Sequence, residues 1–316
     1  MKRKVGVIGV GNISQKAYLP IYTEYQDKFD FIISSRSLEK AERIRSQYKF
    51  SKAVEGIKGL LHEGIEIAFV HNATQAHFET CKELLNAGIH VFVDKPISQN
   101  LLEVEELQTL AKKQNKLFMT GFNRRFAPMT EQLKKIEGKN TLFLSKNRVN
   151  DEHTTDWVIY DLFIHPLDTA FYLLDDEVVR VKSSIVEKAG KLQRAMIHLE
   201  TATTTAIVSM NLKAGANQET FEVQAGGGTY RVENLNRLTS FENGKTAVTE
   251  FDDWTPTLEK RGFSPMVKTF LQAVDTFEEE ENSSLEMFEK ILRQEKVHQS
   301  HELCEQMLRT HIRHQL

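Results

Sequence analysis

Val5-Gly6-Val7-Ile8-Gly9-Val10-Gly11-Asn12-Ile13-Ser14 is the stretch that indicates the fold. An apolar run leads into two glycines, of which the first permits a tight turn and the second a close backbone approach by a pyrophosphate. A helix that begins after the turn would offer unpaired N–H groups and its positive dipole end to phosphates. Ser14 stands third in this G-x-G-x-x-S pattern, where a small residue still permits close helix–strand packing. The stretch predicts a dinucleotide site with contacts from Gly9, Gly11, Asn12 and Ile13.

The first 121 residues alternate short apolar runs with amphipathic stretches. The expected strands are Val5–Gly9, Phe31–Ser34, Ile67–His71, His90–Val93 and Leu117–Thr120. The expected helices between them are Leu38–Tyr48, Gln75–Ala87 and Leu101–Gln114. Strands separated by helices indicate crossover units and a parallel sheet with helices on both faces. We therefore expect an α/β fold whose residues 1–121 form a Rossmann domain.

The pattern changes in residues 122–316. From Leu142 to Phe251, apolar residues alternate with polar ones, which is typical of an antiparallel sheet with one buried face. The runs are Val178–Ser184, Ala195–Leu199, Ala206–Leu212, Phe221–Gln224, Thr229–Val232, Leu238–Phe241 and Thr246–Phe251. Asn243-Gly244, between the last two runs, predicts a tight hairpin. Helices are expected at Asp161–Leu174, Pro265–Glu280 and Leu285–Arg313. These residues predict an α+β substrate-binding and dimerisation domain with a large, mainly antiparallel sheet, whose last helix has the option of packing on the first domain.

Composition excludes several classes of protein. Of the 316 residues 40% are hydrophobic and 27% charged, and the net charge is −3. This balance is typical of a globular protein and argues against nucleic acid as a partner. Cys81 and Cys304 stand far apart, which predicts neither a disulfide scaffold nor a zinc site. The chain has no run of ~20 apolar residues for a membrane span, and the apolar run near Met1 is too short for a signal peptide. We expect a cytoplasmic protein with no membrane association.

The end of the second expected strand bears on the choice of cofactor. NAD-binding sites have an acidic residue there for the ribose hydroxyls, but this chain has Ser34-Ser35-Arg36. Hydroxyl donors and an arginine suit the 2′-phosphate of NADP. NADP(H) is therefore preferred, with NAD(H) as the second option. A plain surface role for Arg36 is the alternative.

A lysine directly follows another expected strand, in Val91-Phe92-Val93-Asp94-Lys95-Pro96. Ligands of open parallel sheets bind at the carboxyl ends of the strands, so Lys95 could bind substrate and stabilise negative charge on an oxygen. A surface lysine before a turn proline is the alternative. Further cofactor contacts are expected at this edge from Asn72, Thr74, His77 and Asp94, although His77 is equally compatible with a structural role.

Asp161 and His165 are four residues apart, so a helix would place both on one face. Pro166 favours a position for His165 in the first helical turn, where proline is tolerated. An imidazole can take the proton of a substrate hydroxyl while hydride leaves its carbon, and a carboxylate can orient the ring. Without further context, a surface Asp–His pair explains the same residues.

Together these motifs resemble the Gfo/Idh/MocA family (glucose–fructose oxidoreductase, inositol 2-dehydrogenase and rhizopine catabolism). Asp94-Lys95-Pro96 is similar to its Glu-Lys-Pro motif, and three other stretches match in order and spacing: Ala73–His77, Gly121–Phe126 and Asp161–Asp168. The Gly121–Phe126 stretch particularly resembles the MviM-like virulence-factor homologues. The resemblance implies an NAD(P)-dependent dehydrogenase that acts on a hydroxyl or carbonyl carbon of a small, sugar- or cyclitol-like substrate. It also implies Lys95, Asp161 and His165 as the catalytic residues.

Some residues depart from the family pattern. Asp94 replaces the usual Glu, Phe163 replaces a glycine, and the residues around Trp157 replace a glycine-rich lead-in. The aromatic side chains would narrow the substrate site or give it an apolar wall. A non-catalytic NAD(P)-binding sensor of the same fold is therefore the alternative function.

The remaining expectations concern substrate contacts and partners. Asn123, Arg124 and Arg125 are expected to bind substrate, with an arginine clamping a carboxylate or phosphate, and interdomain salt bridges are the alternative. Exposed apolar residues on the second sheet favour a homodimer or a higher homo-oligomer. Four C-terminal histidines are expected on a solvated helix face, with no metal site: His298, His301, His311 and His314.

Overall fold

The computed structural model describes residues 2–279 and 284–315 and divides into two compact units. The first contains Met1–Gly121 and Met266–Gln294, and the second contains Phe122–Pro265 and Glu295–Leu316. Residues 266–294 thus group with the nucleotide-binding part, although the sequence assigned all of 122–316 to the second domain.

Aromatic packing explains why this segment groups with the first unit. Phe270 of α10 (Phe263–Glu279) lies 5.5 Å from Phe69 and 5.7 Å from Phe92, between ring centroids. All three side chains are fully buried, and such rings contribute large apolar areas to a core. The expected end of this helix at Glu280 lies outside the described residues.

The first unit contains a six-stranded parallel sheet of order β3-β2-β1-β4-β5-β6, which confirms the expected Rossmann fold. The strands are β1 (Arg3–Ile8), β2 (Phe29–Ser35), β3 (Lys52–Glu55), β4 (Ile67–Val70), β5 (His90–Val93) and β6 (Phe118–Thr120). The principal helices between them are α2 (Leu38–Tyr48), α3 (Gly56–His62), α4 (His77–Asn86) and α5 (Leu101–Lys113). The strand order reverses between β1 and β4, and ligands bind at the carboxyl ends of strands beside such a switch point.

The second unit contains an eight-stranded sheet of order β14-β13-β12-β11-β7-β10-β9-β8, in which only β7 and β10 pair in parallel. Its strands are β7 (Lys139–Asn147), β8 (Arg180–Lys188), β9 (Lys191–Glu200), β10 (Thr205–Asn211), β11 (Gln218–Ala225), β12 (Gly228–Glu233), β13 (Arg237–Glu242) and β14 (Lys245–Glu250). The expected α+β class is confirmed. So is the hairpin, since Asn243 and Gly244 both have positive φ (51° and 73°) between β13 and β14, as a type I′ turn requires.

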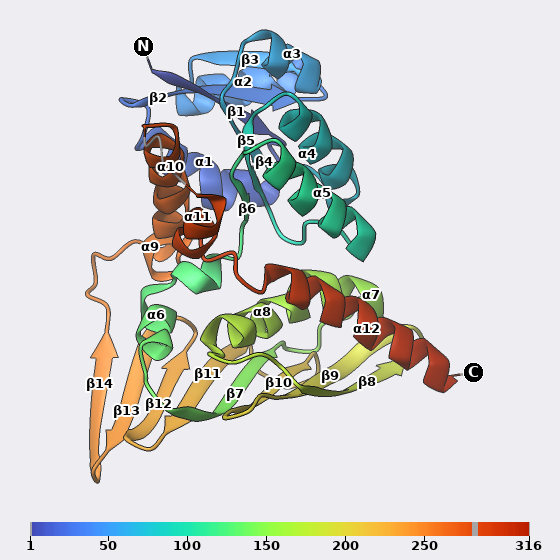
Figure 1. Ribbon diagram of the computed structural model, residues 1–316, viewed down its shortest axis with the longest axis vertical. Helices are drawn as coiled ribbons and strands as arrows, with labels where there is room; N and C mark the ends of the chain where they lie inside the picture. The colour runs from blue at the N-terminus through green and yellow to red at the C-terminus, as the bar shows by residue number, and fades with distance from the viewer. Residues whose placement is uncertain (1, 280–283, 316) are drawn as a thin grey trace. The chain divides into compact units, whose positions relative to one another are not determined.

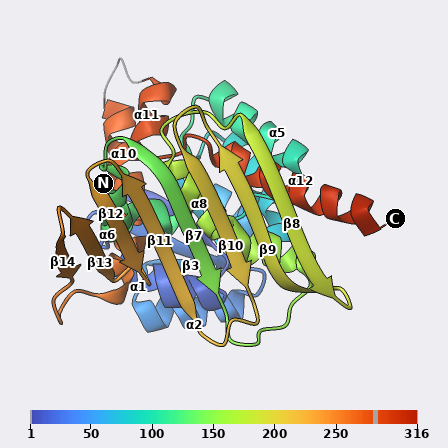
Figure 2. The same cartoon turned by 90° about the horizontal axis from the view of Figure 1, so that it is seen from below.

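Helices cover one face of this second sheet. Figure 1 shows α6 (Pro128–Lys134), α8 (Ile164–Leu173) and α12 (Val297–Gln315) on that side. Figure 2 shows the opposite face, over which no helix of the second unit passes. The alternation along β7 follows this arrangement, because Leu142 and Leu144 are buried while Phe143 is 39% exposed on the open face.

The expected C-terminal helix Leu285–Arg313 is two helices, α11 (Leu285–Ile291) and α12. Arg293 and Lys296 between them have φ of 54° and 61°, a left-handed conformation that ends a helix. Gln294 in this break accepts a hydrogen bond from the Thr120 backbone N–H at 2.8 Å. That contact anchors the break between α11 and α12 to the end of β6. The sequence has no glycine or proline there that would have predicted the break.

The prediction of a solvated histidine face on α12 is wrong for His301. Its ring is 1% exposed, faces a carbonyl oxygen of Val297 at 3.0 Å, and has a pKa lowered to about 4 by burial. His311 is half-buried and lies 3.2 Å from Glu187, His298 is also half-buried, and the side chain of His314 lies outside the described residues. Within residues 2–279 and 284–315, no group of three metal-binding side chains occurs. No helix in the same ranges is long and apolar enough to cross a membrane.

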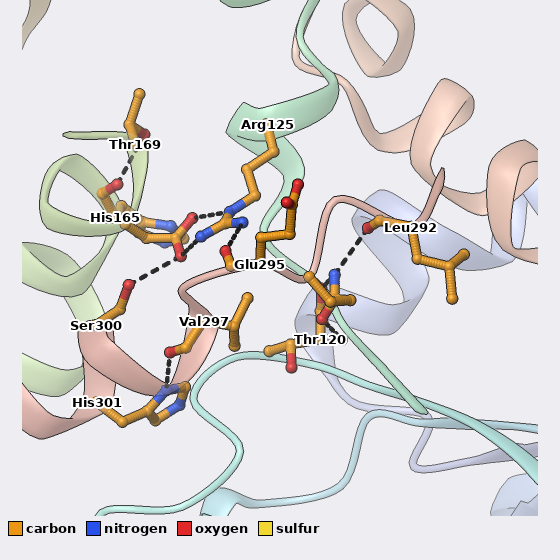
Figure 3. A network of polar contacts seen from close by, with 11 residues as sticks. Thr120, Arg125, His165, Thr169, Leu292, Glu295, Val297, Ser300 and His301 are labelled. Atoms are coloured by element: carbon orange, nitrogen blue, oxygen red, sulfur yellow. Dashed lines mark hydrogen bonds and ion pairs between the residues drawn. The ribbon is translucent and has the colours of Figure 1, made fainter. Parts of the chain in front are cut away.

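A buried ion pair joins three segments of the second unit (Figure 3). Arg125 donates from Nε and Nη2 to the two carboxylate oxygens of Asp168, both at 2.8 Å, and each side chain is 1% exposed. Ser300 Oγ on α12 donates to the same carboxylate at 3.0 Å, and Arg125 also donates to the carbonyl oxygen of Glu295 at 2.7 Å. Asp168 lies on α8, so the pair ties two helices to the 3-10 helix η3 (Asn123–Phe126) by strong bidentate bonds.

We expect Arg125→Met to lower the free energy of unfolding by about 3–5 kcal/mol, because the Asp168 carboxylate stays buried without its cation. The double variant Arg125→Met/Asp168→Leu should recover much of this loss, since it removes both charges. Urea denaturation followed by circular dichroism measures both changes. Arg180→Gln is the matched control, because it breaks an exposed pair with Glu200 and should cost less than about 1 kcal/mol. Equal losses in Arg125→Met and Arg180→Gln would contradict the expectation.

Candidate functional site

The glycine turn after β1 has two glycines with different surroundings. Gly9 has a φ of 91°, and a methyl group there would lie 2.4 Å from the backbone nitrogen of Asn72, so only glycine fits. A methyl group at Gly11 would meet no protein atom within 4 Å. Gly9 is therefore required by the fold itself, whereas the backbone at Gly11 is open to an approaching ligand, as a pyrophosphate site needs.

A helical segment follows the turn at once. Gln15 N donates to Gly11 O at 3.1 Å, and the π-helix η1 (Ser14–Tyr18) continues into α1 (Leu19–Thr23). Ser14 is fully buried, while Ile13 is 44% exposed and Asn12 is exposed. The small third residue thus packs inward, and the two residues before it face solvent beside the turn.

The two serines at the end of β2 have different surroundings. Ser34 is buried and donates its hydroxyl to Gly56 O at 2.8 Å, so this side chain is used within the fold. Ser35 is half-buried and Arg36 is exposed. Of the three residues expected to meet a 2′-phosphate, Ser35 and Arg36 are the two whose side chains are accessible.

His77 joins the loops that follow β4 and β5. Its Nδ1 lies 2.8 Å from the carbonyl oxygen of Pro96, and its Nε2 lies 3.1 Å from that of Asn72. Burial lowers the pKa of His77, while these carbonyls and the charge of Asp94 act in the opposite direction. Both ring nitrogens lie within hydrogen-bond distance of backbone carbonyls, which favours the structural role of His77 among the two options that the sequence left open. Thr74, three residues before it in η2 (Thr74–Ala76), is half-buried.

Asp94 is buried directly before Lys95. Its Oδ1 accepts from the Lys95 backbone N–H at 2.9 Å and from the Tyr18 hydroxyl at 3.2 Å. Burial raises the pKa of Tyr18, so the hydroxyl remains a donor. Lys95 itself is half-buried at the carboxyl end of β5, the edge at which parallel sheets bind ligands.

Sequence reasoning missed the aromatic support behind this loop. The ring of Tyr18 stacks on His71 at 4.1 Å between centroids, and the hydroxyl of Tyr22 lies 2.7 Å from His71 Nε2. Burial lowers the pKa of His71 to about 3, so this histidine is neutral near pH 7. Tyr18 and Tyr22 lie four residues apart in the segment after the glycine turn, which is the only signal in the sequence.

In the second unit, Asp161 and His165 lie in one helical segment, formed by α7 (Thr155–Val158), the π-helix η4 (Ile159–Phe163) and α8. Both side chains are half-buried. α8 begins at Ile164, so His165 lies in its first turn, as Pro166 predicts, but the helical segment as a whole begins further upstream, at Thr155. The π-helix lies directly upstream, and its wider turn accommodates the proline, whose ring would clash with a carbonyl of a regular helix.

Trp157 lies one turn before Asp161 in the same segment and is 38% exposed. Its ring lies 4.1 Å from that of His153, between centroids. The tryptophan therefore presents apolar surface to solvent, supported by a neighbouring histidine.

The three polar residues of the Gly121–Phe126 motif contact other residues of the second unit. Asn123 donates to the carbonyl oxygen of Arg261 at 2.7 Å, and Arg125 is held by Asp168. Arg124 Nη2 donates to Glu219 Oε2 at 3.0 Å. The two arginines thus form salt bridges inside one unit rather than the interdomain bridges that the sequence left open.

Two family models match the chain. Residues 3–122 match the oxidoreductase family with an NAD-binding Rossmann fold, and residues 128–243 match a YceM-like C-terminal domain. The first match covers the parallel sheet that follows the glycine turn, and the second covers strands β7 to β13 of the large sheet.

Individual relatives agree with these models. The oxidoreductase YceM of Salmonella typhimurium is 30% identical over 86% of this chain and 89% of its own length. The scyllo-inositol 2-dehydrogenase (NADP(+)) IolW of Bacillus subtilis is 25% identical over 54% of this chain and 51% of its own. The crystal structure of a dehydrogenase (MviM) from Clostridium difficile is 29% identical and superposes with a TM-score of 0.86 over 98% of this chain and 100% of that one. The chain therefore belongs to the Gfo/Idh/MocA family of oxidoreductases and is an NAD(P)-dependent dehydrogenase.

Proposed function

We propose that the enzyme uses NADP(H) and acts on a hydroxyl or carbonyl carbon of a small polar, sugar- or cyclitol-like substrate. The observation that carries this proposal is the set of Lys95 at the carboxyl end of β5 and Asp161 with His165 in one helical segment. The name of the relative IolW includes both a cyclitol and NADP, which supports the substrate class and the cofactor.

The nucleotide would be held by backbone and side-chain groups at the edge of the parallel sheet. Gly9, Gly11, Asn12 and Ile13 form the turn for the pyrophosphate, which the open position at Gly11 fits. Ser35 and Arg36 would bind the 2′-phosphate, while Asn72, Thr74 and Lys95 lie on the loops after β4 and β5. The bound nicotinamide would supply the hydride acceptor or donor.

The three candidate catalytic residues have distinct tasks in this proposal. His165 takes the proton from the substrate hydroxyl as hydride departs, since a neutral imidazole is a suitable base near pH 7. Asp161 orients the ring and stabilises its charged form. Lys95 places positive charge beside the substrate oxygen as negative charge develops on it. The contacts of Tyr18 and the Lys95 backbone with Asp94 hold the lysine loop in place.

Residues of the second unit would shape the substrate site. Trp157 would give it an apolar wall, which suits the carbon-bound face of a sugar or cyclitol ring. Asn123 and Arg125 support this region through their contacts with Arg261 and Asp168 rather than through free donor groups.

We also propose a homodimer through the open face of the large sheet. Apolar side chains that are 37–48% exposed gather there from five strands: Phe143, Val186, Met196, Phe241 and Val248. A shallow groove on the same face has Ile207 beside Phe143 and Glu222 beside Arg231. A second copy would cover this mixed surface with complementary apolar and charged groups, since an isologous interface pairs a patch with itself.

Lys95→Ala and His165→Ala should each reduce hydride transfer about 10²-fold or more, because general acid–base and charge stabilisation each contribute on that scale. NADP(H) affinity should remain within a few-fold of the parent value. Absorbance at 340 nm with sugars, cyclitols and hydroxy acids measures turnover. The exposed Lys113→Ala and His62→Ala are the matched controls.

Unchanged turnover in both Lys95→Ala and His165→Ala would contradict the proposed roles. Nucleotide binding without hydride transfer in the parent protein, across the whole panel, would instead favour the non-catalytic sensor.

Arg36→Ala should weaken NADP(H) binding about 10- to 100-fold and leave NAD(H) binding unchanged, because a charge-assisted hydrogen bond to phosphate contributes roughly 1.5–3 kcal/mol. Titration by intrinsic fluorescence gives both dissociation constants. Tighter binding of NAD(H) than of NADP(H) by the parent protein would overturn the preference.

Met196→Asp should convert the dimer to a monomer, because it would bury a charge among the apolar side chains of the proposed interface. Light scattering after size exclusion at micromolar concentration gives the mass. Leu102→Asp, at a side chain 71% exposed on α5, should leave the mass unchanged. A monomeric parent protein would refute the dimer.

A further inference from the structure

An excess of positive charge lies on one side of the second unit. Arg124 and Lys146 both bind Oε2 of Glu219, at 3.0 and 3.2 Å, and all three residues are buried, with at most 7% exposed. Arg148, just beyond β7, and Arg261, just beyond α9 (Thr257–Lys260), are half-buried. These four cationic residues and Glu219 are called the basic cluster below.

Asn123 links two members of the basic cluster, because its Oδ1 accepts from Arg124 Nη1 at 3.2 Å and its Nδ2 donates to the carbonyl oxygen of Arg261 at 2.7 Å. Arg148 follows Lys146 by two residues, and the pKa shifts agree with this grouping. Burial lowers the pKa of Arg261, and the charges of Arg124 and Arg148 lower it further. Burial also lowers the pKa of Lys146, to about 7, with Arg124 as the next cause. Only Glu219 opposes these effects. Its own pKa is raised by burial but brought down to about 2 by Arg124 and Lys146, so it remains ionised.

The single negative charge of Glu219 cannot neutralise the positive charges of the basic cluster. Both oxygens of Glu219 are already engaged by Arg124 and Lys146. Arg148 and Arg261 have no ion pair with any carboxylate of residues 2–279 and 284–315. Three arginines and one lysine against one glutamate leave an excess of about two to three positive charges, depending on whether Lys146 is protonated. Like charges held together and partly removed from water are unfavourable unless an anion joins them.

The basic cluster lies near the helix that carries His165. Arg124 is adjacent to Arg125, whose partner Asp168 is three residues beyond His165 on α8. Burial raises the pKa of Asp168, and the charges of Arg125 and, to a lesser extent, Arg124 act in the opposite direction. The 3-10 helix η3, which carries Arg124, packs against α8, so the basic cluster begins beside the helix that carries the candidate base.

We propose that the basic cluster binds a phosphate group of the substrate, so that the enzyme acts on a phosphorylated sugar or cyclitol rather than on a neutral one. A phosphate monoester carries about −1.5 to −2 charges at pH 7, which matches the excess better than a single carboxylate does. The guanidinium groups of Arg148 and Arg261 offer bidentate donors of the kind that phosphate oxygens accept. The inference rests on the proposed function for the substrate's reaction, but the anion site itself does not.

Inorganic phosphate tests the anion site directly. Calorimetric titration of the protein saturated with NADP(H) keeps the cofactor's own phosphate contacts filled. The parent protein should bind phosphate, and Arg148→Gln and Arg261→Gln should each weaken that binding at least tenfold. Arg180→Gln, at an exposed arginine of β8, should bind as the parent does. Acetate binding as tight as phosphate binding, or no loss in either variant, would overturn the proposal.

Turnover then separates this inference from the proposed function. With glucose 6-phosphate and glucose as probes, the parent should show the lower KM for the phosphorylated sugar, and Arg261→Gln should raise that KM at least tenfold without changing the KM for glucose. Turnover of neutral sugars alone, unaffected by Arg261→Gln, would overturn the inference and leave the proposed function intact. Phosphate binding that Arg261→Gln abolishes, without hydride transfer from any compound, would support the anion site and refute the proposed function. Unchanged NADP(H) binding and melting temperature show that each variant is folded.

Discussion

The close approach of the β1 turn to the loop after β4 is the constraint on which the nucleotide-binding unit depends. A methyl group at Gly9 would lie 2.4 Å from Asn72 N and 2.5 Å from the carbonyl carbon of His71, so the two backbones are in direct contact. The same loop is tied onward, because His77 bridges the carbonyl oxygens of Asn72 and Pro96. Pro96 directly follows Lys95. A series of contacts therefore runs from the glycine turn through Asn72 and the His77 side chain to the loop of the candidate catalytic lysine, so the placement of the turn and that of the lysine loop depend on each other.

Proline has a comparable influence on the two helical segments that carry candidate residues. Pro20 follows the π-helix Ser14–Tyr18, and Pro166 follows the π-helix Ile159–Phe163. A proline lacks the N–H of the regular ladder and its ring would meet the carbonyl four residues earlier, so a wider turn upstream relieves the clash. The helix around Asp161 and His165 can then continue through the proline instead of starting at it. Continuity gives both side chains a rigid support, which a frayed first turn would lack.

Local signals in the sequence were sufficient for the fold class. The glycine turn and Asn243-Gly244 each act over a few residues, the alternation of strands and helices repeats a local pattern along the first 121 residues, and each has its expected structure. The short edge strand β3 was not predicted, because Lys52–Glu55 is too brief and too polar to show a period. The break between α11 and α12 was also missed. Its left-handed residues are Arg293 and Lys296, and neither is the glycine or asparagine that usually adopts this conformation after a helix.

The environment of side chains was far less predictable than their positions. Arg124 and Arg125 are adjacent and identical in type, yet their partners lie 95 and 43 residues away in sequence, and no local pattern specifies such pairs. In the structure the two arginines differ in how completely their charges are neutralised. Arg125 has a carboxylate of its own, closed off further by Ser300, so its charge is neutralised and its role is to join helices. Arg124 shares its carboxylate with Lys146 in a cluster that also contains Arg148 and Arg261. A buried arginine that has one carboxylate to itself, such as Arg125, stabilises the fold. Where buried cations outnumber the carboxylates, as around Arg124, binding of an anion from solution is needed to neutralise the remaining charge.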